Sequence, residues 1–249
     1  PNGLLWAQMD NVALSWMNAY VNGHPVTERA GFQVEANALW YNMLCFAIEM
    51  ESKYGSPRGE FVRKWSSVRD LCLDNYQTTF WCPEKNCLAD YVGVNGQNKD
   101  VRSNQLFAAW VPYRAIDDDV LAAMMRTIHN ELLTSRGIRS LSPRNPLYKD
   151  VYEGSQAERD LAYHQGCARP YHLYLYIDTS FRMKGSAALN RAKWLVEGFY
   201  DDLNKHGVGA FSEIYDGDPP HEPHGAISSA LSVAALLGIG YEMEKYWEE

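Results

Sequence analysis

Apolar residues recur every three to four positions in the first clearly patterned stretch of the chain, between Glu35 and Tyr54. This spacing is that of one face of an α-helix, and Gly55 followed by Pro57 would end it. A second stretch starts with Ser56 as an N-cap and Pro57 in the first turn, both of which favour a helix start. The pattern therefore predicts two helices joined by a short turn. The apolar positions are Leu39, Met43, Phe46, Ala47 and Met50 in the first stretch and Phe61, Trp65, Val68 and Cys72 in the second.

The same kind of pattern predicts further helices towards the C-terminus. Three aspartates at 117–119 precede an apolar-periodic segment that Gly137 closes, and negative charge favours a helix N-terminus. Residues 170–183 contain H-L-Y-L-Y-I, which alternates like a strand, but the helical surroundings favour a helix. Residues 186–206 place apolar side chains on one face, and residues 226–246 are almost wholly apolar in their first half, as in a buried helix.

The remaining segments are rich in Gly, Pro and Asn and show no sustained periodicity. They are residues 1–33, 79–103, 139–169 and 211–225. Residues 104–113 are consistent with the opening of one more helix, and no strand-rich region or internal repeat stands out. About seven helices separated by long loops predict an all-α fold, with residues 1–249 as a single domain. Loops this long are usually functional or disordered, and their aromatic and charged content favours function.

The composition excludes some classes of function. The chain has 46% hydrophobic residues and a net charge of −8, and it has no basic cluster, which argues against nucleic-acid binding. No long uncharged apolar segment and no signal-peptide pattern are present, so neither a membrane partner nor secretion is expected. Five cysteines are an odd and sparse set, typical of free thiols in a reducing compartment. These observations indicate a soluble cytoplasmic protein.

The acidic segment Phe211–Gly225 is the most unusual stretch of the chain. It reads F-S-E-I-Y-D-G-D-P-P-H-E-P-H-G, and its Pro and Gly residues are incompatible with a helix. A stiffened acidic loop suits a catalytic carboxylate, although a solvated connection has the same composition. Asp216 and Asp218 are expected to brace the loop. His221 and His224 resemble a metal-binding pair, but no third ligand has suitable spacing, so no metal is predicted.

A set of short motifs runs in order along nearly the whole chain. It comprises L-S-W-M-N-A at 14–19, P-V-T-E-R-A-G at 25–31, V-E-A-N-A-L-W-Y-N at 34–42, S-N-Q-L-F-A at 103–108, R-S-L-S-P at 139–143, Y-H-Q-G at 163–166 and S-E-I-Y-D-G-D-P-P-H at 212–221. Together these motifs resemble the amylo-α-1,6-glucosidase domain of glycogen debranching enzymes. Their number and order make the resemblance specific.

The resemblance implies an (α/α) toroid of six helical hairpins with the sugar site at one mouth of the ring. Since only about seven helices are predicted, the chain would form an incomplete, C-terminal portion of that toroid. The chain starts at Pro1 without a methionine, which fits a piece of a longer protein whose N-terminal hairpins are missing. An incomplete ring would expose apolar helix faces, which normally mark interaction sites.

The resemblance also implies the chemistry: inverting hydrolysis of an α-1,6-linked glucose, with an α-glucan such as glycogen or a limit dextrin as partner and no cofactor. Inverting glycosidases use a general acid and a general base about 6.5–9.5 Å apart. The family's base corresponds to Glu213. Its general acid ends the motif T-W-M-D, which here reads S-W-M-N and places Asn18 at that position. An amide cannot donate this proton, so either the domain is inactive or slow, or Asp10, Glu28 or Glu35 supplies it. A substitution made to trap substrate is a further explanation.

Several residues are candidates for binding the sugar. They are Trp6, Trp16, Arg29, Glu35, Trp40, Gln105, His164, Gln165 and Arg169. Each has an alternative role: the indoles fill cores as readily as they stack on sugars, Glu35 favours a helix N-terminus, and His164 and Gln165 could brace the loop. Arg169 stands where the family usually has a tryptophan, which puts identical substrate geometry in doubt.

Two other functions remain open at this point. A carbohydrate-binding pseudoenzyme, in which Asn18 replaces the general acid, would bind glucan without turnover. A related toroid hydrolase with glucoamylase-like or trehalase-like activity is compatible with the tryptophan-to-Arg169 change.

Overall fold

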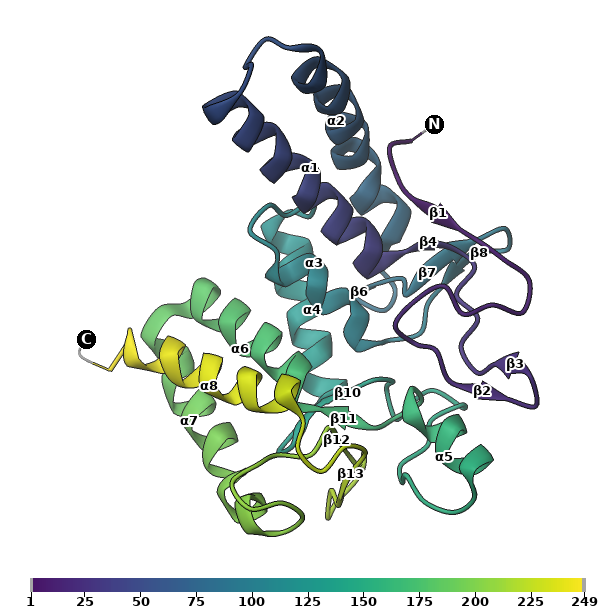
Figure 1. The fold of residues 1–249 in the computed structure, drawn as a ribbon, viewed down its shortest axis with the longest axis vertical. Coiled ribbons are helices and arrows are strands. Elements are labelled where there is room, and N and C mark those ends of the chain that lie inside the picture. Colours follow the sequence, from purple (N-terminus) through teal and green to yellow (C-terminus); the bar gives the residue numbers. More distant parts are fainter. Residues whose placement is uncertain (1, 248–249) are drawn as a thin grey trace. The chain divides into compact units, whose positions relative to one another are not determined.

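The computed structural model describes residues 2–247 and divides them into two compact units. The N-terminal unit comprises residues 2–16 and 28–127, and the C-terminal unit comprises residues 17–27 and 128–247. Helix α4 (Asp118–Glu131) begins in the first unit and ends in the second (Figure 1). No helix within the described residues is long and apolar enough to cross a membrane.

The helices of the N-terminal unit are α1 (Val34–Tyr54), α2 (Glu60–Phe80) and the short α3 (Leu106–Trp110), which follows the 3₁₀ turn η1 (Ser103–Gln105). Helices α1 and α2 form the predicted hairpin, and the Tyr76 hydroxyl of α2 donates to the Val34 carbonyl at 2.9 Å. The predicted start of the second helix is wrong, because α2 begins at Glu60 with Gly59 at its N-cap, and Ser56 and Pro57 lie in the connection before it. The predicted period is confirmed, but the predicted face is wrong. The buried residues of α1 include Ala38, Tyr41, Leu44 and Ile48, whereas Leu39, Met43 and Phe46 are exposed. Helix α1 carries apolar side chains on all of its sides, so periodicity alone could not show which side is buried.

The N-terminal unit also contains strands where the sequence predicted only loops. Strands β1 (Trp6–Ala7), β4 (Gly31–Gln33), β7 (Tyr91–Gly93) and β8 (Gly96–Asn98) form an antiparallel sheet in the order β1-β4-β7-β8. A separate hairpin joins β5 (Trp81–Cys82) to β6 (Cys87–Leu88). Gly31 has a φ of 131°, and a Cβ there would lie 2.2 Å from the Val92 carbonyl oxygen. Only glycine therefore allows β4 to approach β7 this closely.

The C-terminal unit is built on a sheet of five very short antiparallel strands in the order β13-β12-β11-β10-β9. They are β9 (Leu133–Thr134), β10 (Gly137–Arg139), β11 (Ala168–Arg169), β12 (Ile214–Tyr215) and β13 (Pro223–His224). A second hairpin joins β2 (Tyr20–Val21) to β3 (His24–Pro25), and β2 packs against helix α5 (Gln156–Tyr163). The five-stranded sheet brings together chain segments around 168 and 214 that are distant in sequence.

The other helices of the C-terminal unit are α6 (Pro170–Lys184), α7 (Leu189–Glu197) and α8 (Ala230–Glu244), with 3₁₀ turns η2 (Gly185–Ala188) and η3 (Tyr200–Asn204). Helix α8 packs against both α6 and α7. The helix predicted from the strand-like H-L-Y-L-Y-I run is confirmed as α6. The continuous helix predicted over 186–206 is wrong, because the chain breaks at Gly198 and Asp202 then forms an ion pair with Arg136 at 2.7 Å.

The fold is thus helix-rich, as predicted, with short strands in the connections that the all-α prediction had left unstructured. A two- or three-residue strand is too short to show the period-2 alternation from which strands are recognised. These connections carry most of the candidate functional residues.

Candidate active site

The Glu213 carboxylate lies at the start of β12 and has three partners in the C-terminal unit. The Tyr163 hydroxyl donates a hydrogen bond to Oε1, the Ala226 amide donates to Oε2 at 3.1 Å, and Arg169 Nη1 lies 3.6 Å from Oε1. The Glu213 amide donates in turn to the Ala226 carbonyl at 2.9 Å. The Glu213 side chain keeps 29% of its surface exposed, so the carboxylate is held in place and still open to solvent.

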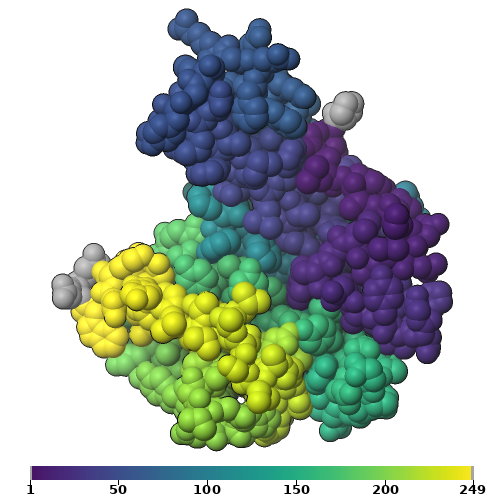
Figure 2. Space-filling model, in the orientation of Figure 1, coloured from purple at the N-terminus to yellow at the C-terminus, as the bar shows by residue number. Residues whose placement is uncertain are grey.

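Three elements bring these partners to Glu213. Ala168 of β11 pairs with Tyr215 of β12, which sets Arg169 beside the carboxylate. Helix α5 ends at Tyr163, and its start is fixed by a capping box in which Ser155 and Glu158 exchange hydrogen bonds. On the face drawn in Figure 2, the green atoms of α5 and the yellow-green atoms of the segment after α7 both reach the surface.

Arg169 is buried and lies next to both Tyr163 and Glu213. Its guanidinium lies 4.4 Å from the centre of the Tyr163 ring, and its Nη2 donates to the Tyr163 carbonyl at 3.0 Å. Burial raises the pKa of the Tyr163 hydroxyl, and the hydrogen bond to Glu213 raises it further, while Arg169 opposes the shift. The tyrosine therefore remains a proton-bearing donor to the Glu213 carboxylate at neutral pH.

Gly225 is required for this arrangement of the carboxylate. Its φ is +73°, and a Cβ at this position would lie 2.8 Å from Oε2 of Glu213 and 3.2 Å from Cγ1 of Ile214. Any side chain here would have to displace the carboxylate or the strand that carries it.

The rest of the acidic loop is braced by hydrogen bonds, as predicted for Asp216 and Asp218. Asp216 accepts from the Tyr152 amide at 2.8 Å and lies 3.0 Å from Nε2 of His224. Asp218 accepts from the Tyr148 hydroxyl at 2.9 Å and from Arg139 at 3.1 Å. Among residues 2–247, no group of three or more His, Cys, Asp or Glu side chains is arranged to hold a metal ion.

His164 and Gln165 lie beneath this cluster. His164 is fully buried with its ring 4.6 Å from the Tyr163 ring, and Gln165 is 5% exposed. The Gln165 carbonyl accepts from the Lys149 amide at 2.8 Å. His164 thus packs against Tyr163 and has its Nδ1 3.5 Å from Nη2 of Arg169, while the Gln165 backbone anchors the segment at Lys149.

Asn18 belongs to the same unit as Glu213. It is exposed, in the segment just before β2, and its neighbour Met17 is buried with its carbonyl bound by the Thr27 hydroxyl at 3.2 Å. The strand that follows this segment, β2, packs on α5, the helix that ends at Tyr163.

A second cluster of charges lies inside the N-terminal unit. Arg29 forms a two-pronged ion pair with Glu35, in which Nη2 donates to Oε2 at 2.7 Å, and its Nε donates to Asp90 at 2.8 Å. Asn104 donates to Asp90 at 2.7 Å and accepts from the Trp16 indole at 2.9 Å. All of these side chains except Trp16 are buried. Burial by itself would lower the pKa of Arg29, but Asp90 and Glu35 raise it, so the guanidinium stays charged.

The other candidates of the N-terminal unit occupy varied positions. Gln105 is buried, accepts from the Leu88 amide at 3.1 Å and donates to the Arg102 carbonyl at 2.9 Å. The Trp40 indole donates to Gly3 at 3.0 Å and packs edge-on against Trp65. Trp6 is 44% exposed and lies edge-on to Phe32.

Two carboxylates named as replacement acids are exposed in the N-terminal unit. Asp10 lies in a turn before Asn11, whose φ is 56°. Glu28 lines a hollow of about 320 Å³ together with Tyr91 and Asn98.

Several residues of these clusters were missed in the sequence. Asp90 fell in a segment predicted to be a linker, and the only local signal was an acid directly after the apolar pair Leu88-Ala89. Tyr163 belongs to the Y-H-Q-G motif, but nothing in its neighbourhood indicated a contact with a residue fifty positions away. Long-range partners of this kind need the sheet register, which the sequence did not reveal.

Comparison with known proteins identifies a family and a fold. A family model described as amylo-alpha-1,6-glucosidase matches residues 1–238. No curated protein matches the chain in sequence.

Three solved structures share the fold. Neutral trehalase Nth1 from Saccharomyces cerevisiae matches with a TM-score of 0.62 at 14% identity, over 84% of this chain and 38% of its own. An uncharacterized conserved protein from Thermus thermophilus matches with a TM-score of 0.56 at 14% identity, over 84% and 48%. The GH63 mannosylglycerate hydrolase from the same organism, in complex with glucose, matches with a TM-score of 0.55 at 16% identity, over 84% and 47%. The chain thus spans less than half the length of these structures.

Proposed function

Because this chain belongs to the amylo-alpha-1,6-glucosidase family, we propose that it is a glycoside hydrolase domain that removes α-1,6-linked glucose at branch points of glycogen or a related α-glucan. Both units would then be parts of one glucosidase domain. A hydrolase of the same fold was solved in complex with glucose, which supports a sugar substrate for this architecture.

The observation that supports the proposal most directly is how the Glu213 carboxylate is held and exposed. It is partly exposed, oriented by the Tyr163 hydroxyl and the Ala226 amide, and adjacent to the positive charge of Arg169. A general base must be fixed in direction and must reach a water molecule, and a carboxylate that is both anchored and open meets both requirements.

In the proposed reaction Glu213 takes a proton from a water molecule, whose oxygen attacks the anomeric carbon of the glucose. The bond between that carbon and the O6 atom of the branch-point residue breaks, and O6 takes up a proton from a general acid. Attack from the side opposite the leaving oxygen inverts the configuration, so the first product is β-glucose.

The source of the second proton is the open step. Asn18 stands at the family's acid position and cannot donate as an acid. Glu35 is a poor replacement because both of its oxygens are engaged by buried Arg29. Asp10 and Glu28 are exposed and are not held in this way. Two alternatives follow for the proton that O6 takes up. Either the domain works slowly because it has no positioned acid, or one of these exposed carboxylates supplies the proton.

Asn18 also favours a second candidate from a different class, a glucan-binding domain without turnover. In that case the anchored Glu213 and the aromatic side chains would hold a glucan chain without cleaving it. The fold shared with neutral trehalase and Arg169 in place of a tryptophan support a third candidate, a related glucosidase that prefers another linkage.

Glucose release from a phosphorylase limit dextrin by the full-length protein tests these candidates. The proposal predicts that Glu213→Gln lowers the rate by about 10²–10⁴-fold, the usual contribution of a general base. It also predicts that Asn18→Asp raises the rate and adds a fall in activity at alkaline pH, because an acid must be protonated to act. Proton NMR of the first product should show the β-anomer.

Binding of limit dextrin without glucose release, in both the parent protein and Asn18→Asp, would contradict the hydrolase proposal in favour of the binding domain. Release of glucose from trehalose or linear α-1,4 chains, with none from limit dextrin, would instead support the third candidate.

A further inference from the structure

The hairpin formed by β5 and β6 holds two cysteines directly opposite each other. Cys82 pairs in register with Cys87 across the two strands. The Ala89 amide donates to the Phe80 carbonyl at 2.7 Å, two residues along each strand from the cysteine pair. Directly opposed residues of an antiparallel pair have Cα atoms about 4.5–5.5 Å apart, within the range of about 4.4–6.8 Å that disulfides span.

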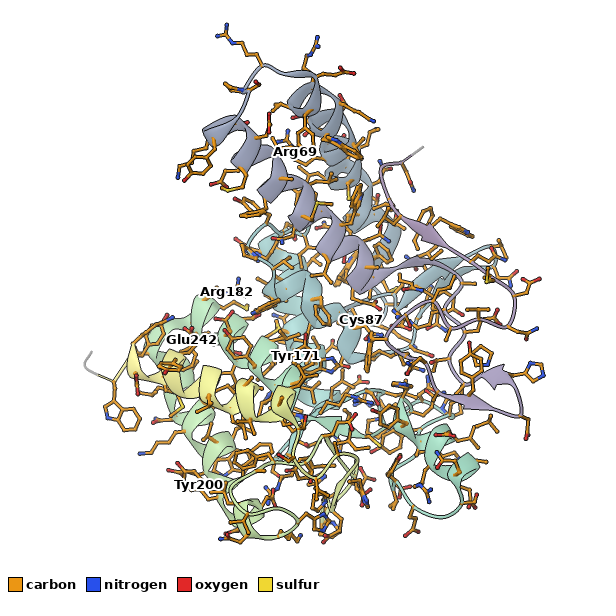
Figure 3. The ribbon with its side chains drawn as sticks, viewed as in Figure 1. Arg69, Cys87, Tyr171, Arg182, Tyr200 and Glu242 are labelled. Carbon is orange, nitrogen blue, oxygen red and sulfur yellow. The ribbon has the colours of Figure 1, made fainter. Side chains whose placement is uncertain are left out.

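The two thiols are buried side by side, and the turn that joins them is open. Cys82 and Cys87 are both 0% exposed, and Cys87 is marked in Figure 3. The Cys82 thiol also lies 3.3 Å from Oε1 of Gln97. The connecting residues 83–86 are exposed and form a turn in which the Lys85 amide donates to the Cys82 carbonyl at 3.2 Å. Because this turn is exposed, we expect a small reagent to reach the thiols when the turn opens.

Cys82 differs chemically from the other buried cysteines. A hydrogen bond from Cys87 lowers the pKa of the Cys82 thiol, with smaller contributions from Lys99 and Lys85, whereas burial opposes the shift. For Cys72 and Cys167, burial raises the thiol pKa to about 12. Since the thiolate is the nucleophile in disulfide exchange, Cys82 is the cysteine best prepared to react.

The hairpin leads directly into the buried charge cluster of the N-terminal unit. The residue after Cys87 is Leu88, whose amide donates to Gln105, and two residues later Asp90 binds Arg29. The Asp90 carbonyl also accepts from the Val34 amide at 3.1 Å, at the start of α1. A covalent bond across the hairpin would therefore restrain β6, which leads into the segment that carries Asp90.

We propose that Cys82 and Cys87 are a modification site, a dithiol that small disulfides such as glutathione disulfide oxidise to an intramolecular disulfide, restraining β6 and the segment after it that carries Asp90. The Cys82 thiolate attacks one sulfur of glutathione disulfide and releases one glutathione thiolate. The Cys87 thiolate then attacks Sγ of Cys82 in the mixed disulfide and releases the second. The protein gives up two electrons and two thiol protons, and glutathione disulfide is reduced to two thiols.

Thiol counting on the full chain after incubation with glutathione disulfide tests the proposal. All five cysteines are reduced thiols in the structure, and the number that react after denaturation should fall by two. The mass of the intact protein should fall by about 2 Da, and peptide mapping should join Cys82 to Cys87. In Cys87→Ser, Cys82 should instead retain a glutathione adduct. Hydrogen exchange at Leu88 and Asp90 should slow in the oxidised protein.

Cys45→Ala is the matched control, because Cys45 lies in α1 and takes no part in the hairpin. This variant should still lose two thiols on oxidation. Five reactive thiols after equilibration with excess glutathione disulfide would overturn the proposal. A disulfide joining any other pair, such as Cys45 and Cys72, would overturn it as well, and so would unchanged hydrogen exchange at Asp90 in the oxidised protein.

Discussion

Two glutamates that face arginines, Glu35 in the N-terminal unit and Glu213 in the C-terminal unit, are bound in opposite ways. Arg29 grips both oxygens of Glu35 and also binds Asp90, and both side chains of the pair are at most 7% exposed. Arg169 lies 3.6 Å from one oxygen of Glu213, which is 29% exposed. In the sequence both glutamates were plausible site residues.

This contrast shows which kind of carboxylate can do chemistry. A carboxylate in a buried two-pronged pair has its lone pairs occupied, and removing its partner leaves an uncompensated buried charge. A carboxylate held by one hydroxyl, one amide and a more distant guanidinium is oriented and still has room for water. We therefore expect Glu35 to act mainly on stability and Glu213 mainly on turnover.

The largest expected effect on folding comes from Glu35→Gln. This change leaves Arg29 with Asp90 as its remaining carboxylate partner, and breaking a buried ion pair typically costs about 3–5 kcal/mol. Chemical denaturation of the variant beside the parent protein measures this cost.

Glu213→Gln is the matched control, since the same chemical change at the open site should shift the unfolding free energy far less. An equal loss of stability in both variants would contradict the claim that Glu35 acts mainly on stability and Glu213 mainly on turnover.

The second prediction concerns pH and the buried His172, which follows β11 in α6. Burial and then Arg169 lower the pKa of His172 from 6.5 to about 3. The folded protein thus keeps the ring neutral, whereas the unfolded chain binds a proton below about pH 6.5. The contribution of His172 to the free energy of unfolding is therefore fully present above about pH 6.5 and is lost as the pH falls towards 3. The loss reaches about 2 kcal/mol at pH 5.

Denaturation curves at pH 7 and pH 5 for the parent protein and His172→Asn isolate this contribution. The variant should lose less stability on acidification than the parent, although it is less stable at pH 7. The same acid sensitivity in both proteins would mean that His172 does not titrate as described.

The third prediction concerns the rate and the variant Tyr163→Phe. This variant keeps the ring under Arg169 but removes the hydroxyl that orients Glu213. A hydrogen bond to a charged group contributes about 1.5–3 kcal/mol, so we expect kcat to fall at least about tenfold. KM should change little, because the Tyr163 hydroxyl contacts the general base Glu213 and not the substrate.

Tyr152→Phe provides a nearby comparison, since the Tyr152 ring packs near Tyr163 and only its backbone amide binds Asp216. This variant should keep nearly full kcat. A similar fall in kcat for both variants would point to general loosening of the loop.

The longer helices were largely predictable from the sequence because each of them shows a period and an end signal, whereas the short α5 was missed inside residues 139–169, which were predicted to be a loop. Gly55 ends α1 as predicted, and the Pro170 segment forms α6. The break at Gly198 was not predictable from apolar spacing, because the ion pair between Asp202 and Arg136 depends on a turn between β9 and β10. The short strands were missed because their pairing is set by distant partners.

The site was predictable only in part, and by a different route. Glu213 and Asn18 were located through matching motifs, which say nothing about contacts. The hydrogen bonds from Tyr163 and Ala226 to Glu213 arise where the segment before β12 meets the end of α5 and the segment after β13. The place of Asp90 in the buried charge cluster could not be predicted for the same reason, because it depends on hydrogen bonds from the distant Arg29 and Asn104.

The eight-residue helix α5 has a consequence for how the protein would respond to heat. A helix this short is not stable by itself, and its capping box and its packing on β2 keep it folded. Its last residue, Tyr163, holds the Glu213 carboxylate. Fraying of its final turn would release the carboxylate while α6 and α8 remain packed, so warming would inactivate the protein at a temperature below its melting point.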